Sequence, residues 1–352
     1  MMDNATESDA TLNRPNLDKP SASGECGNPE GGLHSGLARS ATRRAALGII
    51  GMVILFAVPT FLGVFAVSVM THILTFAVLT GSLVLLMGTA GMPSIGQAAY
   101  FGVGGYAAGL VAQHATLSAP LLLLVAAVAG LVVAAATGWL LVRSRASYFL
   151  MLTLAIGEII ASVANSWSGL TGGSDGMTIP TLAIGSINLD VAGYIYWYTL
   201  VATLVLLGLL GLMRRSPFGL ALRGIRDNEA RMSALGYATG VYKYVAFCLA
   251  GAVAGAAGAL LVTQVRFVSP ADLGFGTSAL VLVAVIIGGA DSLVGGVVGA
   301  VVVIAVQNFL PASWEGHGPL VLGLLLIAAV YLLRGGVAAL PQRIRALKRG
   351  AR

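Results

Sequence analysis

The chain has 352 residues, of which 57% are apolar and only 10% are charged, whereas a water-soluble domain carries about 25% charged residues. This composition excludes an ordinary soluble globule. The run from 45 to 142 contains no Asp, Glu, Lys or Arg, which leaves room for about four membrane crossings. The 47 glycines fit this class, because small residues let membrane helices approach closely.

Polar segments flank the apolar region at both ends. Residues 1–42 are rich in Pro, Gly, Ser and Asn and begin without the apolar core of a signal peptide, so we expect a disordered cytoplasmic tail. Residues 336–352 form a basic tail, also expected in the cytoplasm. Between them, residues 43–335 are predicted to form one transmembrane domain with a fold of the all-α class, a polytopic helix bundle.

Charges and helix breakers divide this domain into about ten predicted crossings. The third and eighth are the weakest, because one is loaded with glycine and the other is short, so eight crossings are the alternative. The predicted crossings lie near 46–70, 72–91, 95–113, 119–142, 147–165, 194–213, 244–265, 275–289, 293–310 and 318–333.

Polar side chains lie within or next to the third and fifth predicted crossings. Glu158 lies eleven residues from the inner end of its span, or about 16 Å, which is near the midplane. No Lys or Arg lies within a span, so we expect a buried acid that is hydrogen-bonded or protonated. It either supports helix packing or lines a translocation path. The same two alternative roles apply to Ser94, Gln97 and Thr153.

The loop at 214–243 is expected to hold one helix of about four turns. Ser216 before Pro217 is a helix start signal, and Gly236 is a natural end. Four apolar residues fall on one stripe of this helix and need a cover, which is either the chain's own bundle or the groove of a cytosolic partner. The stripe is Leu222, Ile225, Met232 and Leu235.

The basic residues predict the orientation of the chain. With both termini inside, Arg266 alone among the 20 Lys and Arg residues falls in an outer segment, as the positive-inside rule requires. An eight-crossing model keeps the same parity. The net charge of +6 therefore reflects membrane orientation, and no basic patch interleaved with aromatic residues indicates nucleic-acid binding.

Several classes of chemistry have no support in the sequence. None of the three lysines stands in a phosphate-binding loop, so nucleotide hydrolysis by this chain is not expected. The four histidines are isolated, and two distant cysteines predict neither a disulfide framework nor a metal cluster. The segment 172–176 is interpreted as a flexible turn. We expect no cofactor and no enzymatic activity, which leaves transport.

Six motifs, in order along the chain, carry a family resemblance over about residues 47–335. They are Gly91–Tyr106, Tyr148–Glu158, Leu170–Gly176, Ser216–Gly236, Phe267–Pro270 and Ile287–Gly296. Together they resemble the LivM-type permease of branched-chain amino acid ABC transporters. Within the fourth of these motifs the expected Glu-Ala-Ala pattern is only approximate, because Arg231 follows Glu229-Ala230. Within the last, Asp291 stands where the family usually has Gly.

The resemblance implies one permease half of a type II ABC importer in the cell (inner) membrane. A second, LivH-like permease, two cytosolic ATP-binding subunits and an extracytoplasmic substrate-binding protein would be its partners, besides membrane lipid. The cargo would be Leu, Ile, Val or related small solutes. Candidate path residues are Ser94, Gly96, Gln97, Thr153 and Glu158. The ATPase-coupling residues would be Leu222, Arg223, Ile225, Arg226, Asp227, Glu229, Met232, Leu235 and Gly236.

A second function class competes with the importer. An ion-coupled secondary transporter or channel would use Glu158 as a proton relay, as acids within membranes often serve. Such a protein would work alone, whereas the importer subunit needs ATPase partners. The proteins that copurify with the chain in mild detergent would separate the two.

Overall fold

A computed structural model describes residues 63–114, 118–144, 146–180 and 192–309, with isolated positions at 56, 59, 183, 184, 187 and 188 and between 320 and 328. The chain divides into two units, 1–55 and 56–352, and all described residues belong to the second. Both predicted tails, most of the first predicted crossing and most of the tenth lie outside the described residues.

Nine main segments build the described helical bundle. They are α2 (Val64–Val84), its π-helical extension η1 (Leu85–Ala90), α3 (Gln97–His114), α4 (Ala119–Leu141), α5 (Ala146–Ser166), α7 (Ala192–Arg215), α10 (Thr239–Val265), α11 (Phe275–Gly288) and α12 (Leu293–Phe309). Shorter elements are α6 (Ser168–Thr171), η2 (Gly173–Asp175), α8 (Pro217–Asp227), α9 (Glu229–Ala234) and η3 (Pro270–Leu273). The strands are β1 (Met177–Thr178), β2 (Ala183–Ile184), β3 (Ile187–Asn188) and β4 (Phe267–Val268).

Five helices of the described part are long and apolar enough to cross a membrane: Val64–Ala90, Ala119–Leu141, Tyr148–Ser166, Gly193–Arg215 and Thr239–Val265. Helices α11 and α12 are apolar but shorter. The prediction of a break near 71 is wrong, because α2 runs through it. Thr71 sits inside the helix and donates its hydroxyl to the carbonyl of Val67 at 2.8 Å, so this polar side chain needs no loop.

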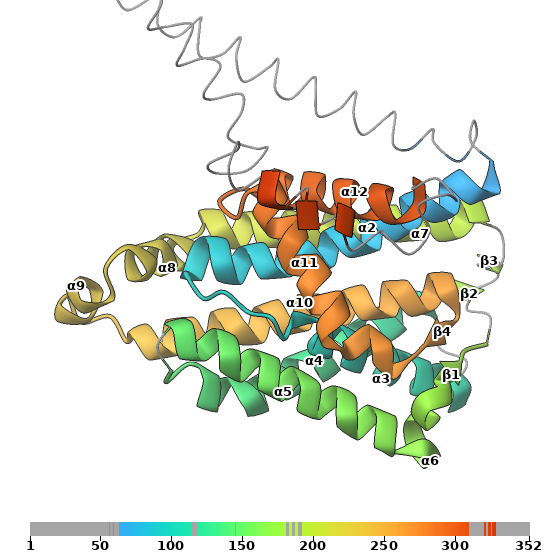
Figure 1. Cartoon of the computed structure of the whole chain (residues 1–352), viewed down its shortest axis with the longest axis horizontal. Coiled ribbons are helices and arrows are strands. Elements are labelled where there is room, and N and C mark those ends of the chain that lie inside the picture. Colours follow the sequence, from blue (N-terminus) through green and yellow to red (C-terminus); the bar gives the residue numbers. More distant parts are fainter. Residues whose placement is uncertain are drawn as a thin grey trace, which may run out of the picture. The chain divides into compact units, whose positions relative to one another are not determined.

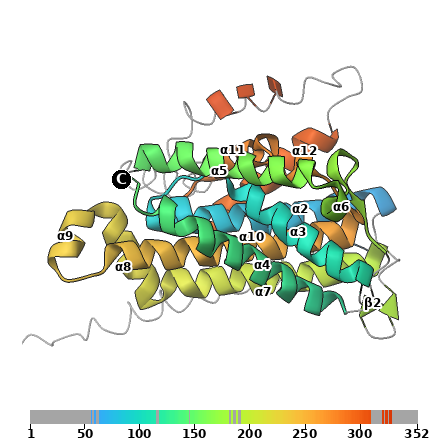
Figure 2. The same ribbon diagram turned by 90° about the horizontal axis from the view of Figure 1, so that it is seen from below.

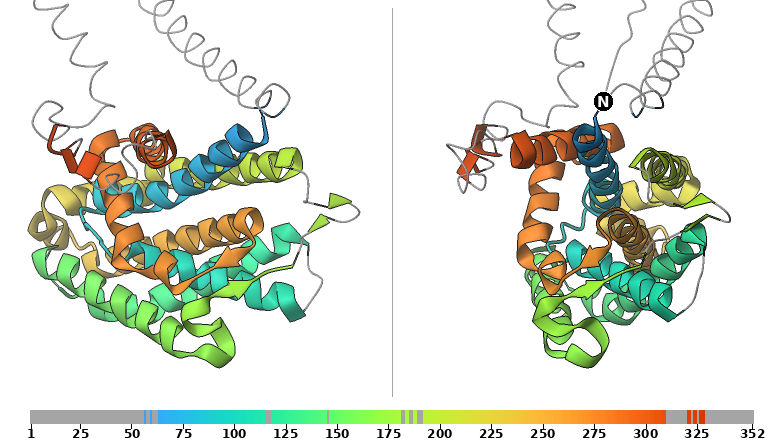
Figure 3. Two further views of the ribbon diagram at one scale, coloured as in Figure 1. Left: turned by 45° about the vertical axis from the view of Figure 1, so that its right-hand side comes forward. Right: turned by 90° about the vertical axis from the view of Figure 1, so that its right-hand side faces the viewer.

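Helices α2 and α10 occupy the interior of the bundle. Helix α2 contacts α7 and α12 on either side and packs on α10 (Figure 3). Helix α10 in turn packs on α3 and α4, and Figure 2 shows it running among α4, α7 and α3. These two apolar helices are almost wholly buried within the chain, whereas most of α4, α5 and α7 faces outward.

Glycine allows the backbone of α10 to touch its neighbours directly. A methyl group at Gly258 would overlap the carbonyl oxygen of Phe101 in α3, and one at Gly255 would overlap that of Ala126 in α4. On the α4 side of the same contact, a methyl group at Gly130 would lie 3.0 Å from the Cα of Gly255. The predicted use of small residues for close helix packing is confirmed here.

The α8–α9 loop and the β strands lie at opposite ends of the bundle (Figure 1), and these two ends differ in charge. The α8–α9 end carries seven of the eight Lys and Arg residues whose side chains are described, and Arg266 lies at the β1–β4 end. At the end that carries Arg266, β1 pairs antiparallel with β4, with Met177 opposite Val268. Strands β2 and β3 form a second two-residue pair, so the described fold is helical apart from these short pairings.

Candidate functional site

The polar candidates near the start of α3 lie inside the helix packing. Ser94, Gln97 and Thr153 are all buried within this chain. The backbone N–H of Ile95 donates to the hydroxyl of Thr153 at 3.2 Å, and a methyl group at Gly96 would overlap the Thr153 carbonyl oxygen. The segment before α3 therefore packs directly on the backbone of α5.

Gln97 joins three helices at the first turn of α3. Its side-chain amide donates to the hydroxyl of Ser82 in α2 at 2.9 Å and to the carbonyl of Ala250 in α10 at 3.2 Å. Its amide oxygen is buried and has no hydrogen-bond partner within the described part of the chain. These contacts are hydrogen bonds between helices, one of the two roles left open by the sequence. A role in lining the path stays a prediction.

Glu158 lies on the outer surface of the described chain, so the expectation of burial within this chain is wrong. Helix α5 packs on η3 and α3 through other residues, among them Thr153 and Gly157, and leaves the Glu158 side chain exposed. One carboxylate oxygen accepts a hydrogen bond from the backbone N–H of Phe275 at 2.8 Å. The expected hydrogen bond is therefore confirmed. Its donor is the first residue of α11, where the helix dipole favours a negative charge.

The loop between α7 and α10 contains two helices instead of the single predicted helix. The hydroxyl of Ser216 accepts from Gly219 N–H, as the start signal predicted. The helix is broken at Asn228, whose extended backbone ends α8 and whose side chain accepts from Arg231 N–H at 2.9 Å to cap α9. Gly236 follows α9 with a φ of 88°, which L side chains rarely adopt.

This break divides the predicted apolar stripe. Leu222 and Ile225 are buried against the chain's own bundle, and Met232 packs over Gly224. Leu235 is exposed, so a single stripe facing one partner is wrong. On the opposite side of α8, Leu220 is exposed together with the charged residues.

The charged residues of this loop tie it to the bundle. Arg223 donates to the carbonyl of Arg214 at 3.0 Å, and Lys243 of α10 pairs with Glu229 at 2.6 Å. Arg226 reaches both the carbonyl oxygen of Gly88 and the carboxylate of Asp291. The side chain of Asp227 is exposed and makes no hydrogen bond or ion pair within the described residues.

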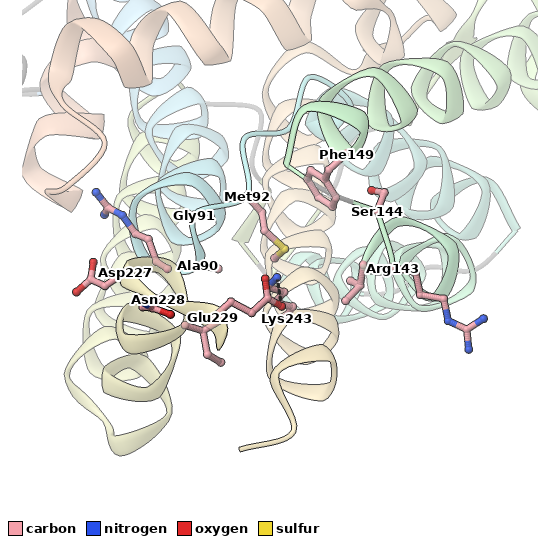
Figure 4. Close-up of a pocket in the computed structure, with 13 residues that line it drawn as sticks. Ala90, Gly91, Met92, Arg143, Ser144, Phe149, Asp227, Asn228, Glu229 and Lys243 are labelled. Atoms are coloured by element: carbon pink, nitrogen blue, oxygen red, sulfur yellow. Dashed lines mark ion pairs between the residues drawn. The ribbon is translucent and has the colours of Figure 1, made fainter. Parts of the chain in front are cut away.

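A polar cavity of about 380 Å³ opens at this end of the bundle (Figure 4). The segment after η1, the turn between α4 and α5, and the junction of α8 and α9 form its walls. The Glu229–Lys243 pair lies on one side, and Met92 and Phe149 lie deeper toward the bundle (Figure 4). Across all described residues, no cluster of His, Cys, Asp and Glu could hold a metal ion.

A model of the branched-chain amino acid transport system / permease component family matches residues 63–330, which is most of the chain. The protein belongs to this permease family. Together with its apolar helices, membership makes the permease a multi-pass membrane transport protein rather than an enzyme. The family resemblance drawn from the six motifs is confirmed.

Two curated relatives are similar to part of the permease. The high-affinity branched-chain amino acid transport system permease protein LivM of Escherichia coli (strain K12) is 31% identical over 159 residues, covering 45% of this chain and 37% of that protein. LivM of Salmonella typhimurium (strain LT2) is 34% identical over 135 residues, covering 38% and 32%. The chain thus spans about a third of the length of these relatives. No solved structure matches it.

Sequence reasoning about the permease missed three contacts that join distant motifs. The turn at 172–176 leads into β1, which pairs with β4, so the third and fifth motifs meet at one end of the bundle. The partner of Glu158 is a backbone N–H in α11, and the partner of Arg226 is Asp291, 65 residues away. A local sequence pattern cannot predict such contacts between residues that are far apart in the chain.

Proposed function

We propose that the chain is the membrane-spanning permease subunit of an ATP-driven importer in the cell (inner) membrane. Its cargo would be branched-chain amino acids (Leu, Ile, Val) or related small solutes, as the names of the relatives and the family suggest. The observation that carries this proposal is the α8–α9 loop. It is capped at both helix starts, is fastened to the bundle by charged residues and presents an exposed outer face.

The basic residues support a cytoplasmic position for the α8–α9 end. Seven of the eight described Lys and Arg side chains collect there, and short loops that carry such an excess stay inside the cell. Both termini would then be cytoplasmic as well, and the β1–β4 end would face the extracytoplasmic binding protein.

The outer face of the loop suits a cytosolic ATP-binding subunit. Leu220 and Leu235 are exposed apolar residues on α8 and directly after α9, and Arg223 and Asp227 place charges between them. Exposed apolar groups framed by charges are typical of interaction surfaces. ATP hydrolysis would take place on two such subunits, because the sequence of this chain contains no phosphate-binding loop.

Glu158 supports a place for the second, LivH-like permease. An acid on the outer face of a membrane helix is costly against lipid, and α5 exposes Met151, Ile159 and Val163 around it. A neighbouring permease would shield this face and form the translocation path with it. Burial of Ser94, Gly96, Gln97 and Thr153 would then correspond to a closed path.

Reconstitution into liposomes tests this proposal against the ion-coupled alternative. The chain is purified with its partner permease, ATPase subunits and binding protein, and leucine uptake is measured with and without ATP while an imposed proton gradient is held constant. We expect uptake to stop without ATP. Uptake that persists without ATP, or a chain that transports alone, would overturn the proposal and favour proton coupling through Glu158.

Two substitutions separate the roles of Glu158. Glu158→Gln keeps a hydrogen-bond acceptor for Phe275 N–H but removes ionisation, whereas Glu158→Leu removes both. We expect uptake to fall in both variants, and more in the Leu variant, if the carboxylate lines the path. Normal uptake in the Gln variant with loss in the Leu variant would assign Glu158 to packing alone. Ser162→Ala, one turn further along α5 and also exposed, is the matched control.

A further inference from the structure

Arg226 links the α8–α9 loop to two other segments of the bundle. Its guanidinium lies 2.6 Å from the carboxylate of Asp291 in the turn between α11 and α12. The same nitrogen donates to the carbonyl oxygen of Gly88 in η1. One side chain of α8 thereby holds the end of α2 and the α11–α12 turn together.

The carbonyl of Gly88 is available because of the local sequence. Met92 N–H, which a regular helix would direct to Gly88, donates to Leu86 at 3.0 Å, and Pro93 has no N–H. The carbonyls at the end of a helix need outside donors, and a cation is favoured there. A methyl group at Gly88 would overlap the carbonyl oxygen of Ala290, so η1 and the α11–α12 turn are already in contact.

Asp291 is bound a second time through its backbone. Arg214, at the end of α7, donates to the Asp291 carbonyl at 2.7 Å, and Arg223 donates to the carbonyl of Arg214. Three arginines are therefore linked at this place, and Arg226 pairs with the carboxylate of Asp291. Without that charge, Arg226 would lose the ion pair that it makes among the described residues.

Helix α11 extends from this cluster toward Glu158. Its last residue, Gly288, lies three positions before Asp291, and its first residue, Phe275, donates to the Glu158 carboxylate. Fourteen residues of α-helix span about 21 Å. A rigid element of this length joins the loop at one end of the bundle to the exposed acid on α5.

We propose that Asp291 is a positioning residue for transport, which holds Arg226 so that movement of the α8–α9 loop is passed through α11 to Glu158. This inference rests on the proposed function, since it presumes that ATPase subunits move the loop. We assign Asp291 and Arg226 no contact with the cargo. Their role is to keep α8, η1 and the α11–α12 turn in one arrangement while the loop moves.

The test uses the complete reconstituted transporter with the variants Arg226→Gln, Asp291→Asn and the double variant. Asp291→Asn leaves the backbone carbonyl for Arg214 intact. We expect leucine uptake per ATP hydrolysed to fall about two- to fivefold in each single variant, the range set by a partly exposed ion pair. The double variant should fall no further, because both changes remove the same contact. Arg215→Gln and Asp175→Asn, exposed and outside the cluster, are charge-matched controls expected to match the wild type.

Salt concentration supplies a measurement that a purely structural role would not move. Raising salt from about 0.1 M to about 1 M shortens the screening length from about 10 Å to about 3 Å. The pair is exposed, with side-chain accessibilities of 37% for Arg226 and 76% for Asp291, so it should weaken. Uptake per ATP in the wild type should then approach that of Asp291→Asn, whose own ratio should change little.

The outcomes distinguish failure of this inference from failure of the proposed function. A wild-type transporter without ATP-dependent uptake would refute the proposed function itself. A wild type that transports, with variants that keep the same ratio of uptake to ATP hydrolysed, would refute only the role of Asp291. Equal losses of uptake and ATPase activity together with loss of assembled complex would also refute it, because they would mark a structural contact.

Discussion

Leu222 and Leu220 stand two residues apart on α8 and face opposite surroundings, which makes them a matched pair. Leu222 is 0% exposed and packs on the chain's own bundle, whereas Leu220 is 60% exposed. Replacing a fully buried Leu by Ala costs about 2 to 5 kcal/mol through lost burial and the cavity left behind. The same change at an exposed site stays within about 0.5 kcal/mol. We expect Leu222→Ala to destabilise the permease and Leu220→Ala to leave its stability unchanged.

The permease carries its own reporter for this measurement. Cys248 is a free, buried thiol in α10, so a thiol-reactive fluorophore labels it only when the bundle opens. With Cys26 replaced by Ser, heating in detergent gives one labelling transition for each variant. The transition of Leu222→Ala should fall by several degrees, and that of Leu220→Ala should match the parent protein.

The same pair tests the proposed docking surface. Leu220→Ala should reduce recovery of the ATP-binding subunits in mild detergent without any loss of thermal stability, because only the exposed residue faces a partner. Equal destabilisation by both substitutions, or a stable Leu222→Ala protein, would refute the assignment of faces on α8.

Three further predictions concern the packing, two of them with a matched control substitution. Gly258→Ala should abolish recovery of folded protein, because its methyl group would overlap the backbone of α3. Gly240→Ala, in the first turn of the same helix, meets nothing within 4 Å and should be tolerated. Gel filtration in detergent measures the recovery of folded protein for both variants. Thr153→Val should reduce the free energy of unfolding by about 1 to 3 kcal/mol, since Ile95 N–H loses its acceptor. The temperature at which Cys248 becomes labelled should fall accordingly. Gly236→Ala should lower the stability of the folded loop by about 1 kcal/mol, because Gly236 has a positive φ, and Gly236→Asn should lower it less. Proteolysis of the α8–α9 loop should therefore be faster in the Ala variant than in the Asn variant. Equal cleavage of the two variants would argue against backbone strain at this position.

The features predicted well from the sequence are those with a local cause. The crossing expected at 119–142 matches α4 (Ala119–Leu141), because Pro120 sits in its first turn and Arg143 follows its end. Ser216 caps α8 as expected for the same kind of reason. An uninterrupted apolar run, by contrast, gives no mark of where one helix passes into the next, so the break expected near 71 was misplaced.

The features that the sequence did not reveal depend on tertiary contacts. Which face of α8 is covered follows from the position of the bundle beneath it, and periodicity alone shows only that Leu222 and Ile225 share a face. The break at Asn228 between α8 and α9 was not predicted, because the apolar spacing from Leu222 to Leu235 favoured one continuous helix. The exposed position of Glu158 and its backbone partner required the placement of α11.

The glycine contacts of α10 have a consequence for how the permease changes shape. Where backbones touch with no side chain between them, no rotamer is available to absorb a sliding motion. Helices α3, α4 and α10 are therefore expected to travel as a single block. Helices α11 and α12 touch in the same way at Gly288, Gly295 and Gly299 and are expected to form a second block, so a rearrangement that opens and closes a passage requires one block to shift against the other.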